Sequence, residues 1–156
     1  MASLLTLTQT QPTRTLKSGE ALITTGEPTG ELYVLEQGKL VVERGGVDIA
    51  TIVEPGALVG EMSVLLGTDP SATVRAAAPT TVRVIDDAIA FLERSPLIAL
   101  HVATLACARL DATSALLVEL KQETATSHSD QSILNRIWGA LMEPEPKRGG
   151  GWQTHE

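Results

Sequence analysis

The chain has 156 residues, of which 43% are hydrophobic and 20% are charged, and its formal net charge is −7. This size and composition predict one globular domain with its own core and exclude a disordered chain. The acidic balance argues against a general nucleic-acid-binding surface, because neutralising phosphates requires clustered Lys and Arg. The N-terminus lacks the features of a signal peptide, and no apolar run is expected to reach membrane-spanning length. The single cysteine, Cys107, excludes an internal disulfide, so we expect a cytoplasmic protein.

Short apolar, β-branched runs separated by turn residues dominate the first half of the chain. The expected strands cover residues 21–24, 32–35, 40–42 and 49–53. Glycines or Pro-Gly pairs follow or separate them, at Gly19, Gly26, Gly38, Gly45 and Gly56. Regularly spaced short strands favour a closed or folded-over β architecture.

The pattern changes at Gly60, where residues 61–66 predict a short helix that ends at Gly67. Strand alternation returns at 73–75 and 81–85, and Asp86-Asp87 predict a helix start with acidic caps. Helices are then expected over 88–93 and 96–122, with Pro96 in the first turn of the longer one. Apolar residues recur along that helix at three- and four-residue steps, and Cys107 is expected to be a small core residue.

A polar break at 124–129 separates this helix from an amphipathic segment over 130–142. We expect the segment to fold back onto the domain; the alternative is a docking surface for a protein partner, with Trp138 as its anchor. Residues 143–156 are rich in Pro, Gly and charge and are expected to be mobile. The predicted division is therefore a domain over 1–123 and an arm and tail over 124–156.

The stretch from Gly60 to Ala76 carries the chemistry of the chain. A glycine that opens a short helix leaves backbone N–H groups of the first turn pointing outward, and such groups attract a phosphate. The carboxylate of Glu61 cannot serve a phosphate, but it can accept hydrogen bonds from a sugar hydroxyl.

This stretch resembles the phosphate-binding cassette of cyclic-nucleotide-binding domains. The pattern of that cassette is Gly-Glu, an apolar run, a Gly-containing turn, Pro-Arg, a small residue, Ala, Thr or Ser, and then Val. Residues 16–20, 26–27, 32–35 and 38–40 resemble the early strands of the same family, and the likeness covers about 14–122. The resemblance implies an antiparallel β-roll, a jelly-roll-like double-stranded β-helix, followed by a long C-terminal helix. It implies cAMP or cGMP as the ligand, and no cofactor.

The resemblance also implies the ligand contacts residue by residue. Glu61, after Gly60, falls where the family holds the ribose 2′-hydroxyl, and the amides of Met62 and Ser63 fall at the phosphate. Ser71, next to Ala72, falls where some bacterial members contact the phosphate through a hydroxyl and an amide. Thr113 and Ser114 match the stretch with which the bacterial catabolite activator reaches the adenine, one of them across a dimer interface.

The chain departs from the family pattern at Pro70, where the family has the arginine that pairs with the cyclic phosphate. Proline brings neither a cation nor a backbone donor. Removing one partner of a buried charge pair costs ~2–5 kcal/mol, which weakens binding roughly thirty- to several-thousand-fold. Another cation would have to compensate, and Arg75 is the nearest in sequence.

Simpler interpretations stand beside these assignments. Glu61 is also a favourable residue for the first turn of a helix, and Ser71, Thr73, Thr113 and Ser114 are ordinary strand or helix residues. The three histidines, His101, His128 and His155, lie in the helical region or the tail, so no metal site is expected. No serine or cysteine is paired with a base, so we expect no enzyme.

Two classes of function remain open. In the first, the chain is a regulatory module that binds a cyclic nucleotide weakly, or a related small anion, and signals through its long helix. In the second, ligand binding is lost and the β-roll is a scaffold for dimerisation or protein interaction. In both, we expect a homodimer through the 96–122 helix. Only about thirty residues follow that helix, too few for a DNA-reading domain, so direct DNA binding is not expected.

Overall fold

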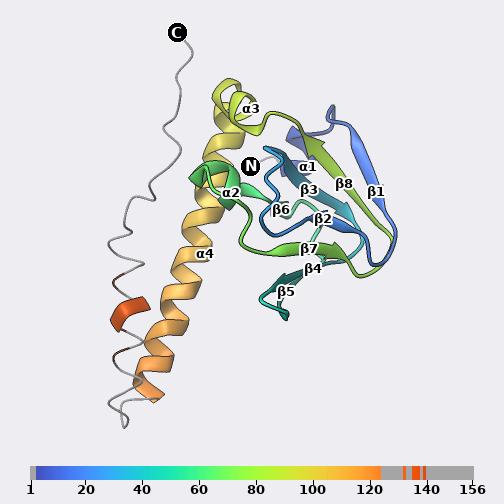
Figure 1. Ribbon diagram of the computed structural model, residues 1–156. Coiled ribbons are helices and arrows are strands. Elements are labelled where there is room, and N and C mark those ends of the chain that lie inside the picture. The colour runs from blue at the N-terminus through green and yellow to red at the C-terminus, as the bar shows by residue number, and fades with distance from the viewer. Residues whose placement is uncertain (1–2, 124–131, 133–134, 138, 140–156) are drawn as a thin grey trace. The chain divides into compact units, whose positions relative to one another are not determined.

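The computed structural model describes residues 3–123, 132, 135–137 and 139, and its strands form two antiparallel four-stranded sheets (Figure 1). One sheet has the order β1-β8-β3-β6 and the other the order β2-β7-β4-β5. The strands are β1 (Thr13–Leu16), β2 (Ala21–Ile23), β3 (Leu32–Gln37), β4 (Leu40–Arg44), β5 (Val47–Ile52), β6 (Leu58–Val59), β7 (Thr73–Ala76) and β8 (Thr80–Ile85). The predicted β-roll followed by a long helix is confirmed.

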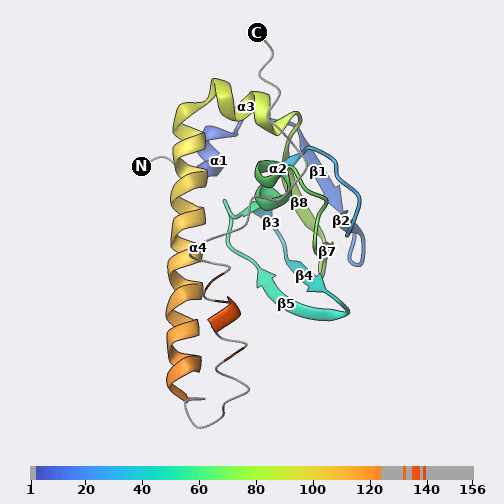
Figure 2. The same cartoon turned by 60° about the vertical axis from the view of Figure 1, so that its left-hand side comes forward.

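Strand alternation decides which side chains enter the roll. On β7, Val74 and Ala76 are buried, whereas Thr73 and Arg75 on the opposite face are half-buried. Opposed residues share a face of the sheet, so the pairing of Val41 with Arg75 places both on the outer side. The hairpin of β4 and β5 forms one edge of its sheet, and its turn is visible in Figures 1 and 2.

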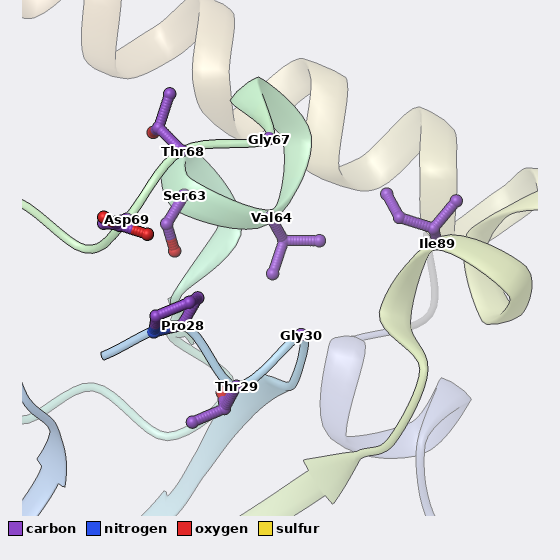
Figure 3. Close-up of a pocket in the computed structure, with 9 residues that line it drawn as sticks. All are labelled: Pro28, Thr29, Gly30, Ser63, Val64, Gly67, Thr68, Asp69 and Ile89. Atoms are coloured by element: carbon purple, nitrogen blue, oxygen red, sulfur yellow. The ribbon is translucent and has the colours of Figure 1, made fainter. Parts of the chain in front are cut away.

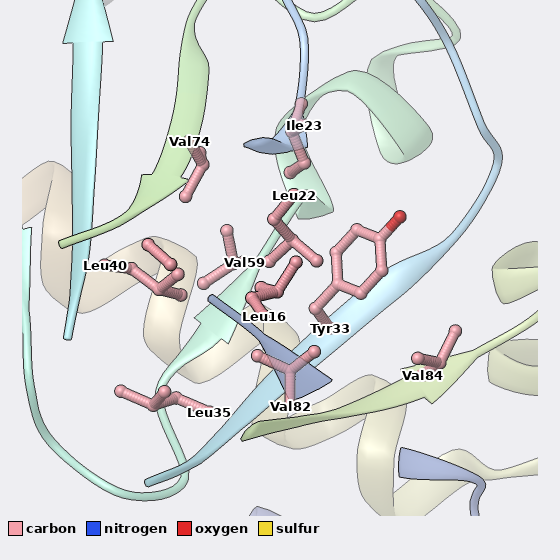
Figure 4. Close-up of a cluster of buried hydrophobic side chains, with 11 residues drawn as sticks. Leu16, Leu22, Ile23, Tyr33, Leu35, Leu40, Val59, Val74, Val82 and Val84 are labelled. Carbon is pink, nitrogen blue, oxygen red and sulfur yellow. The ribbon is translucent and has the colours of Figure 1, made fainter. Parts of the chain in front are cut away.

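The core is aliphatic and draws on both sheets (Figure 4). Tyr33, at the centre of β3, is its one aromatic residue and is fully buried. The cluster consists of Leu16, Leu22, Ile23, Tyr33, Leu35, Leu40, Val59, Val74, Ala76, Val82 and Val84. Most of these residues lie at the strand positions that the alternating pattern predicts.

The labelled helices are α1 (Leu4–Leu7), α2 (Glu61–Leu66), α3 (Ala88–Arg94) and α4 (Pro96–Glu123). The bounds of α2 agree with the sequence prediction, and Pro96 is the first residue of α4, as expected. The described residues up to His101 form one compact unit, and a second begins at Val102, within α4. Most of the 130–142 segment, Trp138 and the tail lie outside the described residues.

Several local predictions were wrong or incomplete. Asp87 stands at the N-cap of α3 with φ 44°, and its side chain makes no capping hydrogen bond. Cys107 is exposed and is therefore not a core residue. The sequence pattern missed the one-turn helix α1 and the two-residue strand β6, which are too short to show periodicity.

The expectation that no segment reaches membrane-spanning length was also wrong for α4. Over Pro96–Gln122, this helix is long enough and apolar enough to cross a membrane by length and composition. One helix of this length and composition is weak evidence for a membrane span, because the core helix of a soluble protein can have the same length and composition. Arg109 and Asp111 in its middle make a lipid-facing position costly.

Candidate functional site

Gly60 allows the start of α2 to lie close to residues of the β-roll. It is the N-cap of α2, with φ 94°, a backbone conformation that favours glycine. A Cβ at this position would lie 3.2 Å from the carbonyl oxygen of Glu31 and 3.4 Å from Cδ1 of Ile23. The positive φ and the close approach both favour glycine at this position, where the first turn of α2 lies beside β2 and β3.

Three predicted ligand residues follow on this first turn. Glu61 is buried, with 8% of its surface exposed, whereas the side chain of Met62 points to solvent. Ser63 Oγ donates a hydrogen bond of 3.3 Å to the carbonyl of Gly60. In a helix the amides of the first turn have no acceptor within the helix itself. The turn therefore combines a buried carboxylate with backbone donors.

Hydrogen bonds join the loop between α2 and β7 to the turn after β2. The amide of Gly26 donates to the carbonyl oxygen of Pro70 at 2.9 Å, and Pro70 is buried. The amide of Thr25 donates to Thr73 Oγ1 at 3.1 Å, and the two hydroxyls lie 2.9 Å apart. These bonds give Pro70 and Thr73 structural roles.

Ser71 and Ala72 lie between this fastened point and β7, with Ser71 exposed and Ala72 half-buried. Val74 on β7 pairs with Ile23 on β2, and Ile23 contacts the position of Gly60. The structure thus brings the loop before β7 and the first turn of α2 to the same part of the roll. Six of the eight predicted residues (Gly60, Glu61, Met62, Ser63, Ser71 and Ala72) belong to this region.

Arg75, the cation nearest in sequence, does not point toward this region. Its Nη2 donates to both carboxylate oxygens of Asp48, at 2.9 and 3.1 Å, and its Nε lies 3.8 Å from Glu43. These partners are on the outer face of the sheet, opposite the buried Val74 and Ala76. Arg75 therefore does not supply a cation to the first turn of α2 or to the loop before β7.

Thr113 and Ser114 lie on α4 within the second compact unit. Thr113 Oγ1 donates to the carbonyl of Arg109, one turn earlier, at 2.8 Å. The hydroxyl keeps its capacity to accept a hydrogen bond, and Arg109 shares its helix face because the two residues are four positions apart.

A pocket of about 270 Å³ lies beside α2 (Figure 3). Residues of the β2–β3 turn, α2, the loop after it and α3 line the pocket: Pro28, Thr29, Gly30, Ser63, Val64, Gly67, Thr68, Asp69 and Ile89. Ser63 is the only predicted ligand residue among them, so this pocket does not coincide with the predicted contacts. Asp69 is its one charged lining residue.

A polar cluster that the sequence pattern did not indicate joins Arg14 on β1, Glu31 just before β3 and Tyr33 on β3. Tyr33 donates a hydrogen bond to Glu31, and Arg14 donates to both oxygens of Glu31 at 3.3 and 3.2 Å. Burial alone would raise the pKa of Glu31, but the hydrogen bonds from Tyr33 and Arg14 outweigh it and lower that pKa. Burial and the bond to Glu31 raise the pKa of Tyr33. The cluster contacts Gly60 through Tyr33 Cδ2 and the Glu31 carbonyl.

Within the described residues, no three His, Cys, Asp or Glu side chains come together as metal ligands. The described residues of this region offer backbone donors, hydroxyls and the Glu61 carboxylate, which are groups that form hydrogen bonds with a ligand.

Comparison with known proteins gives this region a family context. The family model of the cyclic nucleotide-binding domain matches residues 13–92. The structure is similar to that of the Thermus thermophilus catabolite activator protein, with a TM-score of 0.65 and 28% identity over 76% of this chain and 59% of that one. A search of the curated proteins found no match.

Two further solved structures are similar. A cyclic nucleotide-binding domain from Methylobacillus flagellatus has a TM-score of 0.60 and 24% identity, over 69% of this chain and 66% of that one. The N-terminal domain of a transcriptional regulator from Streptomyces coelicolor has a TM-score of 0.53 and 25% identity, over 69% of this chain and 81% of that one. The chain thus spans about three fifths of the length of the Thermus protein.

Proposed function

Because the chain belongs to the cyclic nucleotide-binding domain family, which matches residues 13–92, we propose that it is a regulatory module and not an enzyme. It binds a cyclic nucleotide weakly, or a related small anion, and signals through α4. The observation that supports this best is the buried Glu61 directly after Gly60, on a short helix inside the β-roll. A carboxylate in such a place can accept hydrogen bonds from the hydroxyls of a sugar.

The proposed contacts divide between the sugar, the phosphate and the base. Glu61 accepts from a ribose hydroxyl, and the amides of Met62 and Ser63 face the phosphate together with Ser71. Thr113 and Ser114 on α4 contact the base. With Pro70 in place of a cation, the phosphate has hydrogen-bond donors but no counter-charge, so cAMP and cGMP bind weakly.

A route from the site to α4 is supported by the contacts of α3. The amide of Ala88 donates to the carbonyl of Gly30 at 3.1 Å, which ties α3 to the turn that borders α2. Ser95 alone separates α3 from α4, so a shift of α3 changes the direction in which α4 begins. Such a shift is driven only by a difference in ligand affinity between the two positions.

We further propose that the protein is a cytoplasmic homodimer through residues 96–122, with no direct contact to DNA. Leu110, Leu116 and Leu120 on α4 are 47%, 60% and 48% exposed in the single chain, and a partner helix would cover them. Segment 130–142 is the proposed site for a protein partner.

Calorimetric titration with cAMP and cGMP tests the ligand proposal. The unmodified chain is expected to bind weakly, and Pro70→Arg to bind at least about thirtyfold more tightly, since it restores the counter-charge. Asp69→Arg is the control, because it places the same guanidinium one residue away at an exposed position and raises the net charge by two units, against one for Pro70→Arg. An equal gain in affinity for both variants would mean that any added positive charge near the site strengthens binding.

Signalling is tested with a fluorescent or spin label on Cys107, which is the single cysteine of the chain and is exposed on α4. A change in the label's signal on addition of cAMP to Pro70→Arg is expected. Binding without any change would show that α4 does not report the ligand.

The alternative is a scaffold that has lost its ligand, and Pro70 is the observation that favours it. In that case the unmodified chain, Pro70→Arg and Asp69→Arg all fail to bind cyclic nucleotides, while the chain still dimerises. Sedimentation of the same preparations distinguishes this outcome from loss of the whole fold.

A further inference from the structure

The pocket beside α2 is a second candidate binding site (Figure 3). Its volume of about 270 Å³ is close to the lower end of the range for small-molecule sites, roughly 300–1,000 Å³. The β2–β3 turn, α2 with the loop that follows it, and α3 line the pocket, and all of them belong to the first compact unit. Apart from Ser63, the lining residues differ from the predicted contacts of a cyclic nucleotide. The two sites are therefore tested by different substitutions.

Backbone hydrogen bonds hold the walls of this pocket together. The amide of Ala88, at the start of α3, donates to the carbonyl of Gly30 at 3.1 Å. The amide of Gly26 donates to the carbonyl of Pro70 at 2.9 Å, which joins the turn to the loop. Since these bonds position the turn, the loop and α3 without a ligand, a ligand that binds here pays little for ordering the chain.

The pocket has an apolar end and an acidic end. In Figure 3 the side chains of Val64 and Ile89 lie at one end, Asp69 lies at the other, and Ser63 lies between Asp69 and Val64. Val64 and Ile89 are half-buried, whereas Asp69 is exposed. A ligand that fills this pocket therefore needs an apolar part and, at one end, a group that suits a carboxylate.

The charges around the pocket favour a cation at the acidic end. Asp69 is its one charged lining residue. The stretches that contain the lining residues, 24–30, 60–74 and 86–93, include no Lys or Arg. An anion at this end would meet a carboxylate and no counter-charge, so the pocket disfavours anions.

Hydroxyl groups in the lining narrow the preference to a primary ammonium. Ser63 Oγ donates to the carbonyl of Gly60 at 3.3 Å, and Thr29 Oγ1 accepts from the amide of Glu31 at 3.2 Å. A hydroxyl oxygen has two lone pairs, so both oxygens keep the capacity to accept a further hydrogen bond. A primary ammonium has three N–H donors and no acceptor, which suits a pocket that offers a carboxylate and hydroxyl acceptors.

The size of the charge effect shows that the apolar end must contribute to binding. An ion pair with an exposed carboxylate strengthens binding by about fivefold at most. A bare ammonium ion would therefore bind too weakly to occupy the pocket. Contact of an apolar group with Val64 and Ile89 supplies the remaining affinity.

We propose that this pocket binds a small primary amine, with the ammonium group at Asp69 and a compact apolar body against Val64 and Ile89. The site goes beyond the proposed function, because it requires neither a cyclic nucleotide nor the contacts proposed for Glu61.

Titration of the unmodified full chain with phenethylamine, followed by NMR of the backbone amides, tests the proposal. Phenethyl alcohol is the neutral control and phenylacetate the anionic control, because both carry the same ring on a short chain. We expect the amine to bind about two- to fivefold more tightly than the alcohol, and phenylacetate to bind more weakly than the alcohol. The largest changes in chemical shift should occur at the lining residues, including Asp69 and Ile89. The advantage of the amine should shrink as salt is raised, because salt screens an exposed ion pair.

Substitutions at the two ends of the pocket separate charge from apolar contact. Asp69→Asn removes the charge with little change in shape and should lower the affinity for the amine to that for the alcohol. Glu54→Gln is the matched control, because it removes the same charge at an exposed position that does not line the pocket, and the affinity for the amine should stay unchanged. Ile89→Ala should weaken the binding of amine and alcohol by a similar factor, since it shortens the apolar end.

The outcomes are independent of cyclic-nucleotide binding, so either proposal can fail while the other stands. Equal affinities of the unmodified chain for amine and alcohol would overturn the amine site, and so would an equal loss in Asp69→Asn and Glu54→Gln. Chemical-shift changes confined to residues outside the lining, or no binding of any of the compounds, would overturn it as well. The comparison of the compounds on the unmodified chain decides the proposal even if Ile89→Ala does not fold.

Discussion

Arg75 on β7 donates two hydrogen bonds, of 2.9 and 3.1 Å, to the carboxylate of Asp48 on β5, on the outer face of the sheet. Both side chains are partly exposed, so the pair contributes little stability. Arg75→Met is expected to lower the free energy of unfolding by less than about 1 kcal/mol, measured by urea denaturation. Its affinity for cAMP should equal that of the unmodified chain. A tenfold loss of affinity would show that Arg75 reaches the ligand.

Gly60 is expected to be the glycine at which substitution disturbs the start of α2. Gly60→Ala places a Cβ 3.2 Å from the Glu31 carbonyl at φ 94°, while Gly19→Ala has nearly the same φ, 92°, and open space around the Cβ. We expect Gly19→Ala to cost about 1 kcal/mol and Gly60→Ala about 2 kcal/mol or more. Chemical denaturation measures both. Equal losses would mean that the close approach at Gly60 is relieved by small shifts.

Much of the fold was predictable from local pattern. Gly60 and Gly67 bracket α2 at the predicted residues because both have positive φ, which glycine adopts readily. The alternation of Val74, Arg75 and Ala76 predicted β7. In contrast, β6 is two residues long, and its position depends on pairing with Tyr33 and Val34, which the sequence does not reveal.

The residues of the candidate site could be predicted from the sequence, but the ion pairs and hydrogen bonds of the charged residues near it could not. The order Gly60-Glu61 and the later Ser71 indicated the loop and helix that the structure brings together. The direction of Arg75 could not be predicted, because a bulge between Val42 and Glu43 shifts the register of β4 and β5 and brings Asp48 opposite Glu43. The bonds of Arg14 and Tyr33 to Glu31 join β1 to β3 and are likewise set by tertiary pairing.

Glu31 should make stability depend on acid pH. Its lowered pKa means that its contribution is complete above the pKa of the unfolded chain and is lost as pH falls through the lower, folded value. Glu31→Gln should therefore flatten the fall in the free energy of unfolding between about pH 5 and 3. Urea denaturation over this range measures the slope. Glu27→Gln, on the exposed turn nearby, is the control, and an equal change in its slope would contradict a specific role of Glu31.

Arg83 is expected to hold α1 against the roll. Its Nη1 donates to the carbonyl of Gln9 at 2.8 Å, its Nη2 to Glu36, and 16% of its side chain is exposed. Arg83→Met should lower the free energy of unfolding by about 1–3 kcal/mol, because Glu36 loses its partner. Hydrogen exchange of the Leu7 and Thr8 amides, which bond to residues 3 and 4, should become faster.

The exposed Arg94→Met is the control for Arg83→Met. Unchanged exchange at Leu7 and Thr8 in Arg83→Met would mean that α1 is held by its apolar contacts alone, chiefly through the buried Leu4.

The proposed dimer seam predicts that two exposed positions on α4 respond differently to the same change. Leu116 is 60% exposed and Val118 is 44% exposed, and they lie about 200° apart around the helix. Leu116 shares its face with Leu105 and Leu120, whereas Val118 lies near Asp111 on the opposite face. Leu116→Glu should thus produce monomers at concentrations where the unmodified chain and Val118→Glu are dimers, measured by analytical ultracentrifugation. A monomeric unmodified chain would contradict the dimer, and dissociation by Val118→Glu alone would move the seam to the other face.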